Sequence, residues 1–338
     1  MSVTSDKLVL GIIGLGDWGW NLVRCFSQLE SAKIKMCCDI DSKKTHKISG
    51  AFPKIKMVLN YEDMLKDEEI KAIVISTPIE THFGLAKQAL LSGKNVFIEK
   101  PMSTSAAHAG ELKAIAQKQN LKIMIGHLLK YHPAIEKMKE LISSGEMGEI
   151  YYMYSQRLNL GKISKDSNVL WSFGPHDISV AMYLMGSEPV SVSAIGHSFL
   201  RKQIEDIVFL NLLFKNNKAF HIHLSWLDPH KIRKITIVGS KKMAVMDDME
   251  PVEKIKIYDK GVNPTYTSYG ELLTLRFGEM YIPRFNMAEP LLVECQHFVD
   301  CILEDKAPKT DALEGLCVVK VLETAQKSIL EGCKWIKL

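Results

Sequence analysis

The chain has 338 residues, of which 46% are hydrophobic and 24% are charged. This composition is typical of a folded globular protein with two domains of ordinary size. The formal net charge is only +4 and the basic residues form no long cluster, so the charge does not favour nucleic acid as a partner. No segment approaches the roughly 20 apolar residues of a membrane span. The seven cysteines form no Cys-x-x-Cys pair, which favours reduced thiols, no metal site and a cytoplasmic location.

Up to residue 126, short apolar runs alternate with amphipathic stretches. The runs are expected to be buried parallel strands because both of their faces are apolar. They cover residues 9–13, 34–38, 72–76, 96–98 and 123–125, and helices are expected over residues 21–29, 81–91 and 105–119. Repeated strand–helix units predict an α/β fold with a doubly wound parallel sheet, the Rossmann arrangement.

The pattern changes after Gly126. A helix over residues 133–143 and a strand over residues 150–158 precede a helix that carries His176, which is expected to start at Gly174-Pro175. Closely spaced strand-like runs then predict a large, mostly antiparallel open sheet. They cover residues 190–197, 207–214, 219–227, 232–238 and 254–258, and the closing helices cover 290–303 and 311–330. We therefore expect a first domain over residues 1–126 and an α+β domain over residues 127–338, whose final helices pack back toward the first.

A glycine motif follows the first strand. In "GIIGLGDWGW" three glycines have Gly-x-Gly-x-x-Gly spacing. The first permits a tight turn, the second lets the backbone approach a pyrophosphate, and the third lets helix and strand pack closely. The helix N-terminus that follows offers its N–H groups to the phosphates. We assign this loop to a dinucleotide cofactor: Gly14, Leu15, Gly16, Asp17, Trp18 and Gly19.

Asp39 ends the second strand, about 20 residues beyond the glycine motif. A carboxylate there accepts hydrogen bonds from the adenosine ribose and repels a 2′-phosphate, which favours NAD. Asp41 is a weaker candidate for the same role. Lys43 and Lys44 follow it and keep NADP open.

The loop "STPIETH" follows a later strand, at the sheet edge where open α/β sheets bind their ligands. Ser76, Thr77 and Pro78 are assigned to the cofactor, with Thr77 and Pro78 as a floor for the nicotinamide. His82 is either a further cofactor contact or a helix-start residue.

The segment "FIEKP" places Glu99 and Lys100 at the end of another apolar strand, and both are assigned to the cofactor site. The Lys100 ammonium could also hydrogen-bond a substrate hydroxyl and stabilise the alkoxide that develops as hydride leaves. The alternative is an ordinary solvated lysine. Pro101 is expected to fix the loop, through a trans or a cis bond.

Nearly the whole chain resembles one known family. The segments "GIIGLGDWG", "STPIETH", "EKP", "KYHPAIEKMKELISSGEMGEI" and "WSFGPHDIS" are similar to the glucose–fructose oxidoreductase / inositol dehydrogenase family, Gfo/Idh/MocA. The resemblance implies NAD(P)-dependent oxidation or reduction of a sugar, cyclitol or nucleotide-linked sugar. It also implies dimer or tetramer contacts through the C-terminal sheet. The family's catalytic lysine falls on Lys100 and its catalytic histidine on His176.

Ser172 departs from the pattern of that family, many of whose members have Asp four residues before the histidine. Residues four apart share a helix face, so Ser172 is still expected to point toward the substrate with His176. A hydroxyl cannot raise the basicity of an imidazole as an anion does. Asp177 is expected to project elsewhere, as a helix-start acid.

Three further polar residues are assigned to the substrate: Lys130, Arg157 and Asn159, with Lys162 nearby as a fourth candidate. The basic residues among them suit an anionic substrate such as a sugar acid or a nucleotide-linked sugar. The segments "RLNLG" and "NVLWSFGPHDIS" are similar to family members of nucleotide-sugar and surface-polysaccharide pathways.

Two other functions fit the same residues. Tightly held NAD could oxidise a sugar transiently to permit hydrolysis or elimination, as in some members of the wider family. A relative without turnover could instead sense a ligand, with Ser172 as the mark of lost activity. Between residues 190 and 238, strand alternation predicts one core face and one subunit-contact face, to which Phe209 and Phe220 are assigned.

Overall fold

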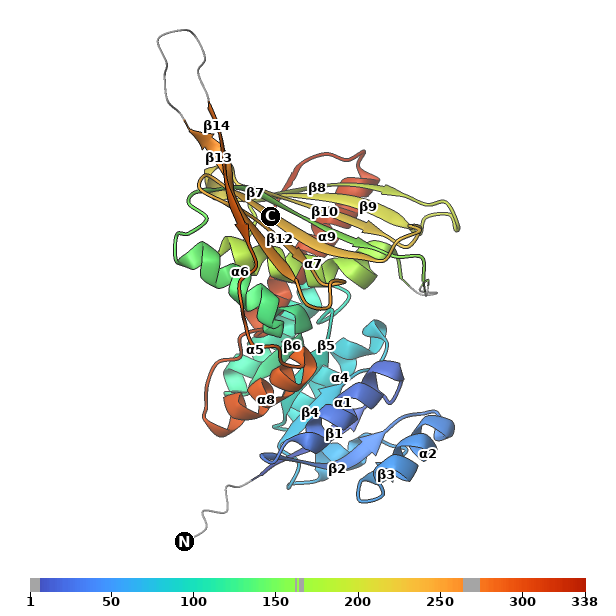
Figure 1. Ribbon diagram of the computed structural model, residues 1–338. Coiled ribbons are helices and arrows are strands. Elements are labelled where there is room, and N and C mark those ends of the chain that lie inside the picture. Colours follow the sequence, from blue (N-terminus) through green and yellow to red (C-terminus); the bar gives the residue numbers. More distant parts are fainter. Residues whose placement is uncertain (1–6, 162, 164–166, 264–273) are drawn as a thin grey trace. The chain divides into compact units, whose positions relative to one another are not determined.

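The computed structural model describes residues 7–161, 163, 167–263 and 274–338 (Figure 1). The chain divides into two compact units. Unit 1 comprises Met1–Tyr131 and Ala288–Lys320, and unit 2 comprises His132–Met287 and Val321–Leu338. In the described part of the chain, every helix is too short or too polar to cross a bilayer.

Unit 1 contains a six-stranded sheet of order β3-β2-β1-β4-β5-β6, in which every neighbouring pair is parallel. The strands are β1 (Leu8–Ile13), β2 (Ala32–Cys38), β3 (Lys56–Val58), β4 (Ala72–Ile75), β5 (Asn95–Glu99) and β6 (Ile123–Gly126). The strand order reverses beside β1, which confirms the doubly wound Rossmann arrangement. Because all strands are parallel, the loops that follow β1, β2, β4 and β5 emerge at one edge of the sheet.

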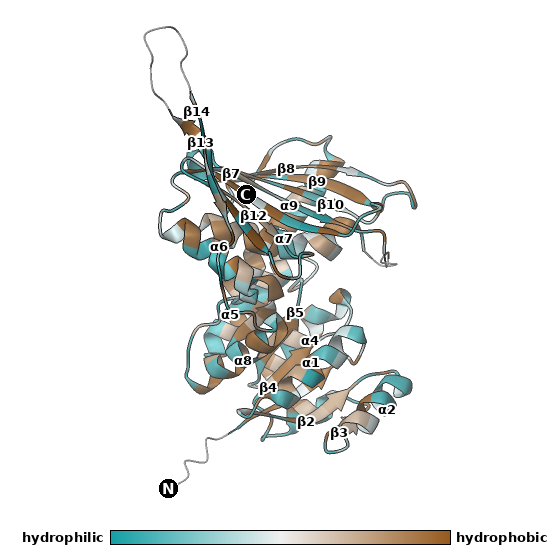
Figure 2. Cartoon of the chain, viewed as in Figure 1, coloured by the Kyte–Doolittle hydropathy of each residue, from teal (hydrophilic) through white to brown (hydrophobic). Residues whose placement is uncertain are grey.

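The helices of unit 1 are α1 (Asp17–Gln28), α2 (Ser42–Ala51), α3 (Glu62–Lys66), α4 (Ile79–Leu91), α5 (Ala106–Gln119), the 3₁₀ turn η1 (Leu128–Tyr131) and α8 (Pro290–Leu303). Helix α9 (Ala312–Leu330) begins in unit 1 and continues in unit 2. The short elements β3, α2 and α3 are absent from the sequence-based expectation. Most residues of helix α2 have the colour of hydrophilic residues in Figure 2, so hydrophobic periodicity marks this helix only weakly.

An aromatic core joins three distant segments of unit 1. Phe26 of α1, Phe97 of β5 and Phe298 of α8 meet edge to face, with ring centroids 5.6–6.4 Å apart. All three side chains are fully buried. Each such burial stabilises the fold by about 1.5–3 kcal/mol. This core fixes α1, and with it the glycine loop, against the sheet.

Unit 2 contains a nine-stranded sheet of order β14-β13-β12-β11-β7-β10-β9-β8-β15. The strands are β7 (Ile150–Leu158), β8 (Ser191–His197), β9 (Ile207–Leu213), β10 (Ala219–Ser225), β11 (Ile232–Gly239), β12 (Met243–Asp247), β13 (Ile255–Asn263), β14 (Thr274–Tyr281) and β15 (Ile336–Lys337). Strands β7 and β10 are parallel and their neighbours are antiparallel, which confirms the mostly antiparallel sheet. Strands β12, β14 and β15 are additional to the expected ones.

The helices of unit 2 are α6 (Pro133–Ser143), α7 (Val169–Met185) and the 3₁₀ turn η2 (Lys215–Asn217). Helix α7 packs on β9 and β10, and α6 packs on α7. The expected start of α7 at Gly174-Pro175 is wrong, because the helix begins at Val169, where the Asn168 side chain accepts a hydrogen bond from the Trp171 N–H at 3.0 Å. Burial of the following apolar residues offsets the backbone hydrogen bond that Pro175 cannot donate within the helix.

The second face of the sheet carries half-buried and exposed polar and aromatic side chains, among them Tyr152, Phe209, His221 and His223. The expectation that Phe220 lies there is wrong, because Phe220 is fully buried in the core. Side chains alternate along a strand, so Phe220 and its neighbour His221 point to opposite faces. Phe209 does lie on the second face, stacked on His223 with ring centroids 4.4 Å apart.

Candidate active site

The glycine loop between β1 and α1 has the geometry of a phosphate cradle. Gly14 adopts a φ of 91°, and a Cβ there would lie 2.5 Å from the Ser76 carbonyl oxygen. A Cβ on Gly19 would lie 2.1 Å from the Gly14 carbonyl oxygen. A Cβ on Gly16, by contrast, would have no heavy atom within 4 Å among the described residues. The first and third glycines therefore close the turn, and the second borders open space.

The open space borders the N-terminus of α1. Gly16 occupies the N-cap position and no side chain caps the helix there, so the first turn can offer N–H groups to an anion. The buried Ser76 hydroxyl beside Gly19 has no hydrogen-bond partner among the described residues. A dinucleotide pyrophosphate fits this set of donors.

The two carboxylates after β2 have different surroundings. Asp39 is buried and accepts hydrogen bonds from the backbone N–H of Leu15 at 2.7 Å and of Asp41 at 2.9 Å. The Asp41 side chain instead caps α2, accepting from the Lys43 N–H at 2.9 Å. Each Asp39 oxygen keeps a second lone pair that a ribose hydroxyl can use. Asp39 thus shapes the glycine loop and has capacity left for a cofactor.

His82 lies between the two loops that follow β4 and β5. Its Nε2 is 2.9 Å from the carbonyl oxygen of Thr77, and its Nδ1 is 2.9 Å from that of Pro101. His82 belongs to α4 and its ring is buried, and this burial lowers the pKa of His82. Since both ring nitrogens face backbone, His82 positions the two loops, and its assignment as a direct cofactor contact stays a prediction.

The carboxylate of Glu99, at the end of β5, is buried beside the glycine loop. It accepts hydrogen bonds from the Trp18 indole at 2.5 Å and from the Lys100 backbone N–H at 3.3 Å. A Cβ on Gly126 would lie 3.0 Å from its oxygens, so only glycine leaves room for the carboxylate there. Burial raises the pKa of Glu99 to about 7.

Lys100 follows Glu99 directly and is half-buried, and its bond to Pro101 is cis. The chain direction of β5 places it at the same sheet edge as the glycine loop, Thr77 and Pro78. The structure therefore gathers the residues assigned to the cofactor at one edge of unit 1.

Helix α7 carries the second group of assigned residues, in unit 2. Ser172 and His176 are four residues apart in this helix and thus on one face. Arg157 of β7 pairs with Asp177, its Nε 2.5 Å from Asp177 Oδ2, and both side chains are largely buried. Asp177 is therefore the partner of a buried arginine inside α7, and its expected role as a helix-start acid is wrong.

Arg233 of β11 was not found by sequence reasoning. It lies directly opposite Arg157 in the β7–β11 pairing. Its guanidinium lies over the Phe173 ring of α7, 5.3 Å from the ring centroid. In the sequence it stands in "KIRKIT" among other basic residues, and only the strand pairing singles it out.

Two family models match the chain. The model described as "Oxidoreductase family, NAD-binding Rossmann fold" matches residues 8–127, and the one described as "GFO/IDH/MocA C-terminal domain" matches residues 135–245. Together these matches span well over half of the chain. The chain belongs to the Gfo/Idh/MocA family.

Curated proteins similar to this Gfo/Idh/MocA chain include several with a stated activity, among them a dehydrogenase and a hydratase. UDP-N-acetylglucosamine 3-dehydrogenase of Acidithiobacillus ferrooxidans is 25% identical, over 74% of this chain and 77% of its own length. The 2,7-anhydro-N-acetylneuraminate hydratase of Mediterraneibacter gnavus is 24% identical, over 70% of this chain and 66% of its own length.

A solved structure shares the fold over the whole chain. GenD2 from gentamicin A biosynthesis, in complex with NAD, superposes with a TM-score of 0.84 at 19% identity, over 100% of this chain and 98% of its own. At this identity the likeness establishes the fold alone. The NAD-binding Rossmann domain of the Gfo/Idh/MocA family covers every residue assigned to the cofactor.

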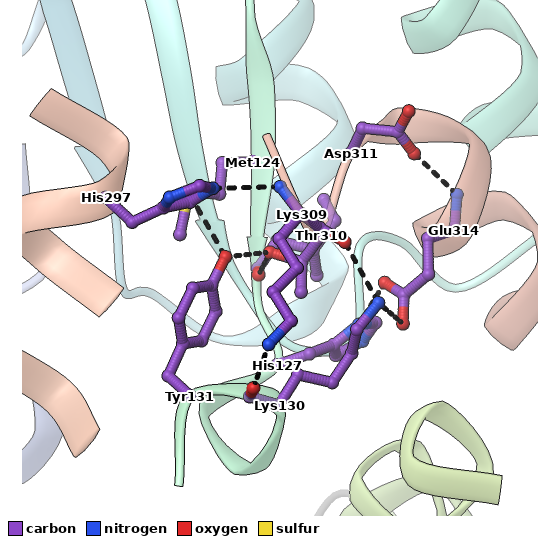
Figure 3. A network of polar contacts seen from close by, with 10 residues as sticks. Met124, His127, Lys130, Tyr131, His297, Lys309, Thr310, Asp311 and Glu314 are labelled. Atoms are coloured by element: carbon purple, nitrogen blue, oxygen red, sulfur yellow. Dashed lines mark hydrogen bonds and ion pairs between the residues drawn. The ribbon is translucent and has the colours of Figure 1, made fainter. Parts of the chain in front are cut away.

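Lys130 lies in a polar network of unit 1 (Figure 3). Its ammonium donates to the Lys309 carbonyl at 2.9 Å and lies 3.4 Å from Glu314 Oε1, and Glu314 Oε2 lies 2.5 Å from His127 Nδ1. Lys309 in turn donates to the Lys130 carbonyl. Burial, and then the charge of Lys130, lower the pKa of Lys309 to about 8. These contacts join η1 to α9 and to the segment before it, and the assignment of Lys130 to the substrate stays a prediction.

Asn159 follows β7, and its backbone N–H donates to the Ser225 carbonyl at 3.1 Å. This places Asn159 at the end of β7 that also holds Arg157. Lys162, the further substrate candidate, lies outside the described residues.

Proposed function

We propose that this protein transfers hydride between a nicotinamide cofactor and a hydroxyl- or keto-bearing carbon of a sugar, cyclitol or nucleotide-linked sugar. The observation that carries the proposal is the edge of unit 1, where the open side of Gly16 and the end of β5 with Lys100 lie at the same end of the sheet. The membership in an NAD-binding oxidoreductase family supports it. The 3-dehydrogenase among the relatives supports a nucleotide-linked sugar as substrate.

In the proposed reaction, bound NAD supplies the hydride acceptor. The Lys100 ammonium donates a hydrogen bond to the reacting hydroxyl oxygen and stabilises the alkoxide as it forms. The His176 imidazole accepts the hydroxyl proton. In the reverse direction the same two groups polarise the carbonyl and return the proton. Asp39 holds the adenosine ribose and Glu99 supports the loop that carries Lys100.

The experiment is a screen of free and nucleotide-linked sugars with NAD and with NADP, followed by the nicotinamide absorbance. The proposal expects reduced cofactor to form in proportion to oxidised sugar, and expects both Lys100→Met and His176→Asn to abolish most of it. Turnover that is unchanged in both variants would refute the assigned roles.

The hydratase among the relatives favours a second candidate, a reaction in which NAD oxidises the sugar transiently and is regenerated. The same two residues would then serve proton transfers on both sides of an elimination. Product formation without accumulation of NADH would favour this candidate, whereas stoichiometric NADH would exclude it.

We also propose that the second face of the unit 2 sheet contacts another copy of the chain. Phe209 and Tyr152 leave apolar area on this face, and apolar surface of this kind is usually covered in a stable protein. Light scattering is expected to show a dimer or tetramer at micromolar concentration. A monomer at that concentration would contradict the proposal.

A further inference from the structure

Two arginines of unit 2 lie side by side on the sheet face that contacts α7. Arg157 and Arg233 are direct partners in the antiparallel β7–β11 pair, and each reaches α7, at Asp177 and Phe173 respectively. Like charges in directly opposite positions of two strands destabilise a sheet. An arrangement of this kind therefore requires negative charge nearby.

Asp177 forms an ion pair with Arg157. Arg233 donates through Nη1 to the carbonyl oxygens of Leu158 and Ile232, both at 2.8 Å, and rests on Phe173. Within the described residues, no carboxylate forms an ion pair with Arg233, and no hydrogen bond uses its Nε or Nη2. Those two nitrogens form the edge of a guanidinium that binds a carboxylate or phosphate in a bidentate way.

The surroundings of Arg233 also make its charge costly. Burial, and then the charge of Arg157, lower the pKa of Arg233 to about 10, with Asp177 and Asp248 acting in the opposite direction. The guanidinium is still charged at neutral pH. An anionic ligand on its Nε–Nη2 edge would offset both the lost hydration and the repulsion.

The position of Arg233 relates this anion site to His176. Phe173, on which Arg233 rests, is three residues before His176 in α7. Residues three apart are neighbours on a helix surface, so Arg233 rests on a side chain that is a neighbour of the assigned base.

We propose that Arg233 binds the anionic group of the substrate, either the carboxylate of a sugar acid or a phosphate of a nucleotide-linked sugar. The proposal rests on the proposed function, since it takes His176 as the proton-transfer group for the same substrate. It moves the anion-binding role from Arg157, which Asp177 neutralises, to its strand partner.

The experiment measures binding to the full chain by isothermal titration calorimetry with three probes: D-glucuronate, UDP-glucose and D-glucose. Glucuronate and UDP-glucose separate the carboxylate from the phosphate as source of the anion, and glucose is the neutral match. The wild type is expected to bind one anionic probe more tightly than glucose. Arg233→Met is expected to weaken the binding of that probe by about 10–100-fold, which is the usual effect of losing a hydrogen bond to a charged group. The binding of glucose should not change.

Two further variants make the test specific. Lys234→Met is the matched control, because it removes one positive charge from the next position of β11, which points to the opposite face and pairs with Asp247 at 3.0 Å. It is expected to leave all three affinities unchanged. Arg233→Lys keeps the charge but loses the bidentate edge, so it should recover only part of the affinity. If Arg233→Met fails to fold, the loss in Arg233→Lys carries the test.

The outcomes separate this proposal from the proposed function. Equal binding of anionic and neutral probes to the wild type would overturn it, and so would unchanged binding in the Arg233 variants or an equal loss in Lys234→Met. NADH formation from sugars is measured independently. Turnover of neutral sugars without any anion preference would overturn only the role of Arg233, whereas anion binding through Arg233 without turnover would overturn only the oxidoreductase proposal.

Discussion

The two units bury different ionisable groups near the residues assigned to the cofactor and to the substrate. Unit 1 buries the carboxyl groups of Glu99 and Glu294, and both Glu294 oxygens have no hydrogen-bond partner among the described residues. Burial raises the pKa of both groups, and the nearby Glu99 raises that of Glu294 further. Unit 2 buries guanidinium groups instead, at Arg157 and, in part, at Arg233.

The difference teaches how each kind of group tolerates burial. A carboxyl group can take up a proton and lose its charge when it is buried. An arginine cannot release its proton near neutral pH, so its charge must be matched by an anion. Asp177 matches Arg157, and we assign the substrate to Arg233. Four predictions test this contrast, in order of decreasing expected effect.

The largest effects are expected at the two proposed catalytic groups, one in each unit. His176→Asn is expected to lower turnover by roughly 10²–10⁴-fold, the usual contribution of general acid–base catalysis. Lys100→Met should do comparable damage, and the double variant little more, because both groups act on the same oxygen. Steady-state kinetics measures this. The control is His230→Asn, at an exposed histidine, which should leave turnover unchanged. If the losses of turnover in the two single variants add fully in the double variant, the two groups do not act on the same oxygen.

Cofactor affinity is expected to depend on Asp39 and hardly on Asp41. Asp39→Ala removes a charged acceptor for the ribose and the acceptor of the Leu15 N–H, so NAD should bind about 10–100-fold more weakly. Any preference for NAD over NADP should become smaller as well. Asp41→Ala is the matched control, since its carboxylate caps α2 and its loss should affect stability more than binding. Fluorescence titration measures the affinities for NAD and for NADP. Tighter binding of NADP than of NAD by the wild type would refute the role of Asp39.

The buried acid Glu99 should make stability fall as the pH rises. Its pKa is about 7 in the folded state against an ordinary value of 4.5, so between these values the folded state holds more protons than the unfolded state. Glu99 therefore contributes about 1–3 kcal/mol to the free energy of unfolding at low pH, and this contribution is lost as the pH rises through 7. Glu99→Gln keeps an acceptor for Trp18 and should flatten this change. Urea unfolding at pH 5 and pH 8 measures the change in the free energy of unfolding. An equal change in the wild type and in Glu99→Gln would contradict the role of Glu99 as a buried acid.

The smallest effect is expected at Ser172. Ser172→Asp places an anion one turn before His176, which stabilises the imidazolium. The acidic limb of the pH–rate profile should then move to higher pH. Ser172→Asn is the neutral control of similar size and should leave the limb in place. If the two profiles coincide while both variants are folded, Ser172 does not face the base.

Much of the fold follows from local patterns. The apolar runs in the first 126 residues predicted β1, β2, β4, β5 and β6, because a strand buried on both faces is continuously hydrophobic. The start of α7 was misplaced, because Gly174-Pro175 is a strong local signal for a helix start. The burial of Val169 and Leu170 outweighs that signal. Phe220 was assigned to the wrong face, since alternation specifies a relative face and the core decides which one is buried.

The sequence by itself determined the doubly wound sheet, the phosphate loop and the residues that end its strands. These features depend on interactions within short segments, such as the turn that needs Gly14 and the acid about 20 residues beyond the motif. Only the tertiary structure decided which arginine has a carboxylate partner and which histidine braces two loops. Arg157, Asp177 and Arg233 come from three separate elements, and a charge is neutralised by what lies next to it in space.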